Sequence, residues 1–305
     1  MRHLRWLIVR MTVVCLGVLF AVGTLAAKDI TFVTWNMQWF PSGKANQVMP
    51  AEVEMARTAQ AARMLVQAVD ETEGSMEHVV FCLQEVRDGS TCSNLVAHID
   101  RERLRVAAVS GFRNPYGRLE MQQVAILTTL PVVEARSVPW RGEANLKFGR
   151  GFTYAILDIG EGELAAVFCI HLKSNLNRTG DLLETQMNIY KREATSQQIL
   201  DRLRELRTRF GKRLSKVVVA GDFNTNEDQD MFVSEATLRS FYGAHFRNCF
   251  TGLRRKSRVT HPGTGGYPDA TFDYILYRGF DDLVARKIIP VPGLSDHRPV
   301  SITLR

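Results

Sequence analysis

Acidic, amide and imidazole side chains stand at the ends of six apolar runs of the sequence. Such runs are typical of buried β-strands, and a single polar residue at a strand end has a simple structural explanation, such as a cap or a turn. Six coincidences predict instead that the strand ends meet in one polar pocket. Its carboxylate and amide oxygens would suit a hard divalent cation, and its imidazoles would transfer protons. These residues are Asn36, Glu85, His171, Asp222, Asn224, Asp273, Asp296 and His297.

The elements that position these residues are strands with a few long helices between them. Runs rich in Val, Ile, Phe and Tyr predict strands over residues 30–35, 78–83, 124–128, 152–158, 164–170, 216–220, 271–277 and 300–304. Apolar spacing predicts helices over residues 51–71 and 181–209, the second with a basic end that we interpret as a solvated face. Because no repeat or low-complexity linker interrupts residues 28–305, we expect one domain with sheets packed face to face and helices outside.

Composition is that of a globular protein and argues against disorder, with 45% apolar and 23% charged residues among 305. The net charge of +7 falls to +4 without residues 1–27, which hold three arginines and no acid. This mild basicity is compatible with a polyanionic substrate but has many other causes.

Residues 1–27 have the layout of a secretory signal peptide. Arg2, Arg5 and Arg10 precede an uncharged stretch over residues 11–27, which ends in small residues. We expect cleavage after Ala26 or Ala27 and a secreted or periplasmic protein. The alternative is an uncleaved membrane anchor formed by residues 11–27.

Four cysteines follow the leader, and an export route permits disulfides. Cys82 and Cys169 lie in apolar runs and are expected to be buried thiols. Cys92 and Cys249 have polar neighbours in the sequence, so they are the pair that we expect to form a disulfide.

The motifs around the polar residues resemble those of the endonuclease/exonuclease/phosphatase superfamily, in the same order. They are Trp35-Asn36, Leu83-Gln84-Glu85-Val86, Gly221-Asp222-Phe223-Asn224, Phe272-Asp273-Tyr274-Ile275-Leu276 and Ser295-Asp296-His297-Arg298-Pro299-Val300. The resemblance covers essentially all of residues 28–305. It implies an α/β four-layer sandwich of the deoxyribonuclease I type, in which two mainly antiparallel sheets pack together and helices flank them.

Further segments resemble the deoxyribonuclease I branch. Gln84-Glu85-Val86-Arg87-Asp88 is similar to its first metal-site segment, and His171 stands where deoxyribonucleases and sphingomyelinases have a histidine. Arg113, Asn114 and Tyr116 resemble a loop that enters the minor groove, and Arg150 resembles an arginine that contacts phosphate. The resemblance therefore implies DNA contacts at these four residues.

The resemblance also implies a role for each residue of the pocket. Glu85, Asn36 and Asp296 would bind Mg²⁺, or alternatively Ca²⁺ or Mn²⁺. His171 and His297 would share the parts of acid and base in an order that stays open, and Asp273 would orient His297. Asp222 and Asn224 would complete the pocket.

Four further segments near the pocket carry expectations of their own. Glu120 would partner His171, or Gln122 would take that place without a charge. We interpret Phe272 as core packing, Trp39-Phe40 as packing on the helix that follows, and the Gly-rich residues 260–266 as a loop near the site.

We predict a metal-dependent phosphodiesterase that acts as a deoxyribonuclease I-like endonuclease on nucleic acid, with DNA as the expected substrate. A sphingomyelinase-type phospholipid phosphodiesterase and an inositol-phosphate phosphatase are the alternatives. A binding protein without activity is disfavoured, because a dead site has no physical reason to keep the full set of acids and imidazoles. We expect a monomer without a stable protein partner.

Overall fold

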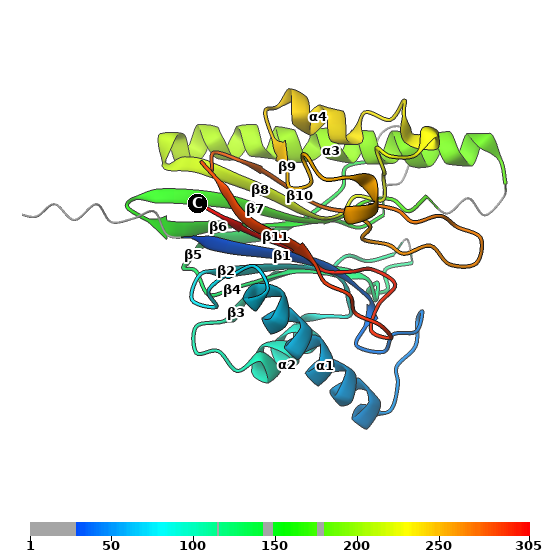
Figure 1. Ribbon diagram of the computed structural model, residues 1–305, viewed down its shortest axis with the longest axis horizontal. Coiled ribbons are helices and arrows are strands. Elements are labelled where there is room, and N and C mark those ends of the chain that lie inside the picture. Colours follow the sequence, from blue (N-terminus) through cyan, green and yellow to red (C-terminus); the bar gives the residue numbers. More distant parts are fainter. Residues whose placement is uncertain (1–28, 115, 143–148, 176–179) are drawn as a thin grey trace, which may run out of the picture.

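The computed structural model describes residues 29–114, 116–142, 149–175 and 180–305, and its strands form two six-stranded sheets packed face to face (Figure 1). In order, the first sheet holds β11 (Leu283–Ile288), β12 (Val300–Leu304), β1 (Ile30–Phe40), β2 (Val79–Val86), β4 (Gln123–Thr128) and β3 (Arg105–Val109). The second holds β5 (Val132–Pro139), β6 (Gly151–Gly160), β7 (Glu163–His171), β8 (Leu214–Asp222), β10 (Asp273–Arg278) and β9 (Arg247–Asn248).

Helices cover the outer face of each sheet, which completes the predicted four layers. α1 (Ala51–Asp70) and α2 (Gly89–Ile99) lie against the first sheet, and α3 (Leu182–Phe210) and α4 (Thr237–Gly243) against the second (Figure 1). Three short 3₁₀ turns also occur in the described residues, at Gly211–Arg213, Asp230–Phe232 and Arg255–Ser257. The predicted fold class is confirmed.

The sheets are mainly antiparallel, as predicted, but each contains one parallel pair. β1 pairs in parallel with β2, and β7 with β8, while the other described strand pairs are antiparallel. A parallel pair needs a long crossover, which α1 and α3 supply. Parallel strands end at the same edge of a sheet, so the residues that follow β1 and β2, or β7 and β8, lie next to each other.

Apolar side chains fill two buried layers. The larger layer includes the space between the sheets, where Phe32 of one sheet and Phe168 of the other belong to the same cluster, and it continues to Leu203 of α3. The smaller layer lies between the first sheet and its helices, and includes Leu65 and Leu95. Burial of these side chains supplies the main driving force for folding and holds the strand ends in place.

The predicted Cys92–Cys249 disulfide is wrong, because the four cysteines that follow the leader are all free. Cys92 is buried between α2 and the first sheet, whereas Cys249 belongs to the larger core cluster. Polar sequence neighbours misled the prediction, since both side chains face the core of the elements that carry them. Cys82 and Cys169 are buried thiols, as expected.

The signal peptide prediction lies outside the described residues. Among the residues that the structure does describe, no helix has the length and apolar character needed to cross a bilayer.

Candidate active site

Strand register places three predicted site residues in one row across the second sheet. His171 ends β7 opposite Asp222 of β8, and Asp222 in turn stands opposite Asp273 of β10. Residues directly opposite on neighbouring strands point to the same face of a sheet. The row therefore sets an imidazole and two carboxylates side by side.

The first sheet and the turn before β12 bring the remaining residues to the same place. Asn36 stands opposite Gln84 across the parallel β1–β2 pair, next to Glu85, and Asp296 and His297 come just before β12. One cavity of about 870 Å³ is lined by Asn36, Glu85, Arg150, His171, Asp222, Asn224, Asp296 and His297, together with other residues. The structure thus gathers residues that lie as far apart as positions 36 and 297.

Asp273 lies buried behind His297 and fixes its ring. Nδ1 of His297 donates to Oδ2 of Asp273 at 2.8 Å, which leaves Nε2 on the side of Asp222. The backbone of His297 is held by Nε1 of Trp35, which donates to its carbonyl oxygen at 3.0 Å. Burial disfavours a charged imidazole, but Asp273 and Asp222 more than offset burial and raise the pKa of His297 to about 10.

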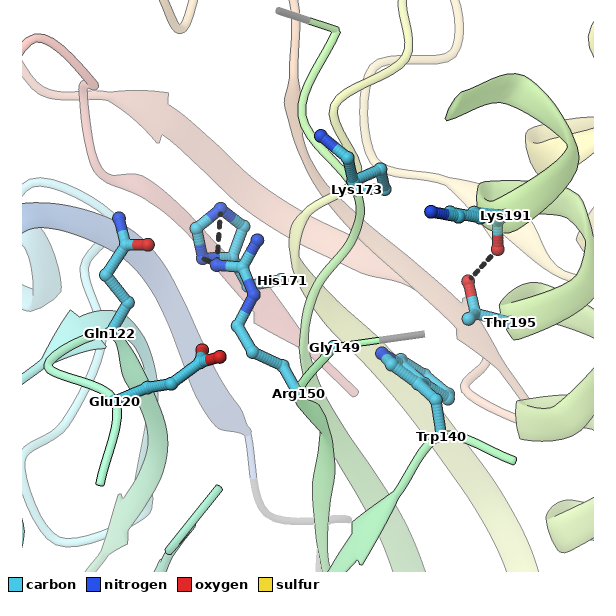
Figure 2. A pocket seen from close by; sticks show the side chains of 9 residues that line it. All are labelled: Glu120, Gln122, Trp140, Gly149, Arg150, His171, Lys173, Lys191 and Thr195. Atoms are coloured by element: carbon cyan, nitrogen blue, oxygen red, sulfur yellow. Dashed lines mark hydrogen bonds between the residues drawn. The ribbon is translucent and has the colours of Figure 1, made fainter. Parts of the chain in front are cut away.

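His171 occupies a different environment on the other side of Asp222. Its Nε2 lies 3.5 Å from Oδ2 of Asp222, and its Nδ1 lies 2.8 Å from Nη1 of Arg150 (Figure 2). A guanidinium can only donate, so Nδ1 accepts and the neutral ring carries its proton on Nε2. Burial and then Arg150 lower the pKa of His171 well below its ordinary value.

The neighbour of Nδ1 is therefore Arg150 and neither of the two residues that the sequence proposed. Glu120 and Gln122 line the pocket next to His171, with the Glu120 side chain directed toward Arg150 (Figure 2). The sequence could not reveal this pairing, because Arg150 directly precedes β6 whereas His171, 21 residues later, ends β7.

Asp222 is the buried carboxylate between the two imidazoles. Its Oδ2 accepts from Nδ2 of Asn36 at 3.0 Å, and its Oδ1 accepts from the backbone nitrogen of Asn224 at 2.9 Å. Burial, with a contribution from Asp273, raises the pKa of Asp222 to about 7. Asn224 has a left-handed backbone, with φ 51°, and its Nδ2 donates to the carbonyl of Leu172 at 3.3 Å.

The acidic side chains of the site fit a divalent cation. Glu85, also left-handed with φ 59°, accepts from the backbone nitrogen of Trp39 at 2.9 Å and lies 3.4 Å from Nδ2 of Asn36. Oδ1 of Asp273 is buried without a hydrogen-bond partner among the described residues. Several carboxylates close together in a buried site repel one another unless a cation offsets their charge.

Asn36 and Asp296 differ in whether their side-chain oxygens face the place where such a cation would bind. Asn36 turns its amide nitrogen to Glu85 and Asp222, and its oxygen accepts from the backbone nitrogen of Gln38 at 3.1 Å. Its part as an oxygen ligand stays a prediction that requires the amide to turn. Asp296 is exposed at the cavity and, with His261 and His297, places donor atoms within 4.8 Å of one another.

His261 is a site residue that the sequence analysis did not single out. Its ring packs edge-on against that of His297, with centroids 4.8 Å apart and planes at 71°. Burial and then the charge of His297 lower the pKa of His261. The only signal was its place in the Gly-rich stretch before Asp273. That stretch does lie at the site, where backbone bonds join His261 to Ala270.

Three of the four predicted DNA-contacting residues lie outside the cavity. Arg113 and Asn114 bond to their own turn, through the carbonyl of Gly117 and the backbone nitrogen of Tyr116. The Tyr116 side chain is 89% exposed. Arg150, in contrast, lines the cavity beside His171. Contact of the exposed turn with DNA stays a prediction.

Two aromatic side chains are cavity walls, where packing was expected. Phe272 is half-buried, lines the cavity and contacts the rings of Phe232 and His261, so its interpretation as core packing is wrong. Trp39 also lines the cavity, while Phe40 packs in the layer between the first sheet and its helices, as predicted for it.

Two imidazoles beside buried carboxylates, at the shared edge of two packed sheets, form a site suited to proton transfer next to a divalent cation. The sequence matches the profile of the Endonuclease/Exonuclease/phosphatase family over residues 33–297. The chain belongs to this family. Its members are typically phosphodiesterases or related hydrolases and generally depend on a divalent metal.

Solved structures share the fold at low sequence identity. An endonuclease/exonuclease/phosphatase family protein from Leptotrichia buccalis is 14% identical with a TM-score of 0.62, covering 90% of this chain and 99% of its own. TDP2 from Caenorhabditis elegans is 15% identical with a TM-score of 0.60, covering 91% and 74%. SmcL is 15% identical with a TM-score of 0.62, covering 91% and 99%. A comparison with curated proteins found no significant match.

Proposed function

We propose that the protein is a secreted, Mg²⁺-dependent phosphodiesterase that cleaves nucleic acid, with DNA as its substrate. One observation carries the proposal. Nε2 of His171, at the end of β7, and Nε2 of His297, in the turn before β12, lie 3.5 Å and 3.9 Å from the same oxygen of Asp222. A phosphate ester held at this point meets two imidazoles in different charge states.

The two histidines would act differently on such an ester. His297, with Nδ1 fixed on Asp273, can change its charge and would move the proton between Nε2 and the attacking water or departing oxygen. His171 is kept neutral beside Arg150 and would donate a hydrogen bond from Nε2 to a phosphate oxygen. In this proposal His297 transfers the proton and His171 binds the phosphate.

A divalent cation held by Glu85 and the neighbouring acids would supply charge neutralisation for the phosphate. Asn224 is placed to donate from its side chain once the phosphate competes with the Leu172 carbonyl. Arg150 and Lys173 add positive charge to the cavity wall. These features favour an anionic diester over a neutral ester.

A phospholipid phosphodiester is the second candidate substrate, and one observation favours it. Met231 and Tyr267 line the cavity while remaining 56% and 73% exposed. Apolar side chains at a cavity mouth suit contact with a lipid surface.

The deciding experiment incubates the purified protein and Mg²⁺ with plasmid DNA, sphingomyelin liposomes and a phosphoinositide panel, with and without a chelator. We expect plasmid nicking that the chelator abolishes, and a loss of at least about 100-fold in His171→Ala, the scale of one lost hydrogen-bond donor to the transition state. His98→Ala, which changes an exposed histidine of α2, is the matched control and should cleave normally. Lipid cleavage without nicking would replace the first candidate with the second.

Secretion is a separate proposal, supported by the composition of residues 1–27. N-terminal sequencing of the exported protein should find Ala27 or Lys28 first. An intact N-terminus in a membrane fraction would show that the leader is an anchor.

A further inference from the structure

A second, smaller pocket adjoins the catalytic cavity on the Nδ1 side of His171. It has a volume of about 310 Å³, within the range of small-molecule sites, roughly 300–1,000 Å³. Arg150 and His171 line both the pocket and the catalytic cavity, so the two spaces share a wall. Figure 2 shows Trp140 along one side and Lys173 and Lys191 above it.

The charge of this pocket is strongly unbalanced. Among the described residues that line it are three cations, Arg150, Lys173 and Lys191, and one carboxylate, Glu120. Figure 2 shows the amino end of Lys191 directed across the pocket from α3. Like charges that share a half-buried space repel one another more strongly than on an open surface, because the local dielectric constant is lower there. An anion placed among them would remove this repulsion.

Buried contacts also hold the two segments that carry Lys191 and Lys173 in fixed positions. The guanidinium of Arg192, fully buried next to Lys191 on α3, pairs with Glu235 through contacts of 2.8 Å and 2.6 Å. Its Nη1 also donates to the carbonyl oxygen of Lys173 at 3.0 Å. The buried Arg192 side chain therefore fixes the helix that carries Lys191 to the segment that carries Lys173. A site positioned in this way loses little entropy when it binds a ligand.

We propose that Arg150, Lys173 and Lys191 bind a second phosphate of the substrate, next to the phosphate that is cleaved. The proposal rests on the proposed function, because it assumes that the cleaved phosphate occupies the cavity of His171 and His297. A nucleic-acid strand carries one phosphate per nucleotide, so a second phosphate follows the one that is cleaved. The substrate is then recognised through two neighbouring phosphates, and base contacts are not required.

The test compares two short substrates, a dithymidine with one phosphodiester and the same molecule with an added terminal phosphate. We expect the added phosphate to raise kcat/KM at least about tenfold in the wild-type protein, the scale of one charge-assisted contact. In Lys191→Gln this ratio should fall toward one. Arg204→Gln removes an exposed cation from the same helix outside the pocket and should keep the wild-type ratio. Equal kcat/KM values in the wild-type protein, or an unchanged ratio in Lys191→Gln, would overturn the proposal.

A binding measurement in chelator keeps the proposal independent of turnover. Thymidine 3′,5′-bisphosphate should bind the wild-type protein at least about tenfold more tightly than thymidine 5′-monophosphate, and Lys191→Gln should remove this difference. Inositol 1,4-bisphosphate is the comparison that identifies the source of the second phosphate, and we expect it to bind more weakly than the nucleotide. Equal binding of the mono- and bisphosphate would refute the pocket even if DNA is cleaved. Bisphosphate preference without any DNA cleavage would retain the pocket and refute the nuclease.

Discussion

Asp273 and His297 form a buried pair in which Nδ1 of the ring meets Oδ2 of the carboxylate at 2.8 Å. The pair joins the start of β10 to the turn before β12, so it links the two sheets directly at the site. The ring is thereby oriented with Nε2 toward Asp222, 3.9 Å away. Asp273 thus both orients the imidazole of His297 and favours its charged form.

Replacing Asp273 by Asn should lower the pKa of His297 from about 10, because burial then acts with less opposition from carboxylates. The hydrolysis rate should fall by about 100-fold or more, since the imidazolium is less stabilised and its ring is no longer held by Asp273. NMR titration of the imidazole protons in the metal-free protein measures the pKa. A normal rate together with an unchanged titration would show that Asp273 has only a structural part.

Mg²⁺ should stabilise the protein more strongly at higher pH. Burial and then Asp273 raise the pKa of Asp222 to about 7, so a bound cation must displace a proton at lower pH. We expect the increase in Tm on adding Mg²⁺ to grow between about pH 5.5 and about pH 8. In Asp222→Asn the increase should be smaller and nearly independent of pH. Thermal unfolding with Mg²⁺ or with chelator at both pH values gives the comparison, and equal increases in the wild-type protein would contradict it.

Arg150→Gln should raise the pKa of His171 toward its ordinary value of about 6.5. In the wild-type protein this ring stays neutral while the unfolded chain takes up a proton. Its contribution to stability is therefore complete above about pH 6.5 and is lost as the pH falls below that value. When the pH is lowered from about 7.5 to about 5, Arg150→Gln should lose less of its free energy of unfolding than the wild-type protein does.

Urea unfolding at the two pH values measures this difference, and imidazole NMR locates the titration. Arg113→Gln is the matched control, because it removes an arginine of the exposed turn. A pKa of His171 that does not move in Arg150→Gln would show that Arg150 does not contribute to its lowering.

The sequence predicted the central strands better than the edge strands. It also predicted which residues belong to the site better than which side chains contact each other there. Asp222 and Asp273 could be recognised because each stands at the end of an apolar run. The strands β5 and β11 could not, because alternating exposed residues make these edges of the sheets less apolar. His261 and the Arg150–His171 contact depend on which loops and strands meet in space, and no local pattern encodes that.

The thiols of the folded protein should resist both oxidation and alkylation. Burial raises the pKa values of Cys92 and Cys249 to about 12, so hardly any reactive thiolate is present at neutral pH. A reducing agent should leave Tm unchanged. Mass spectrometry after alkylation should find no label on the folded protein and full labelling after unfolding. Any intramolecular crosslink found in the exported protein would contradict the structure.

Gly221→Ala should disrupt the site by separating β7 from β8. Gly221 has φ 150°, and an added Cβ would lie 2.0 Å from the carbonyl oxygen of Ile170, the residue before His171. The strands cannot stay in register at that separation, so the free energy of unfolding should fall by about 3 kcal/mol. Activity should fall with it, because the same register sets His171 opposite Asp222.

Gly160→Ala is the control for backbone conformation alone. Gly160 also has a positive φ, of 97°, but nothing lies within 4 Å of its added Cβ. We expect this variant to lose about 1 kcal/mol of its free energy of unfolding and to retain the wild-type rate, because it strains only the end of β6. Urea unfolding and hydrolysis rates of the two variants separate strain from steric contact. Equal losses in both would show that close approach of β7 and β8 at Gly221 does not position the site.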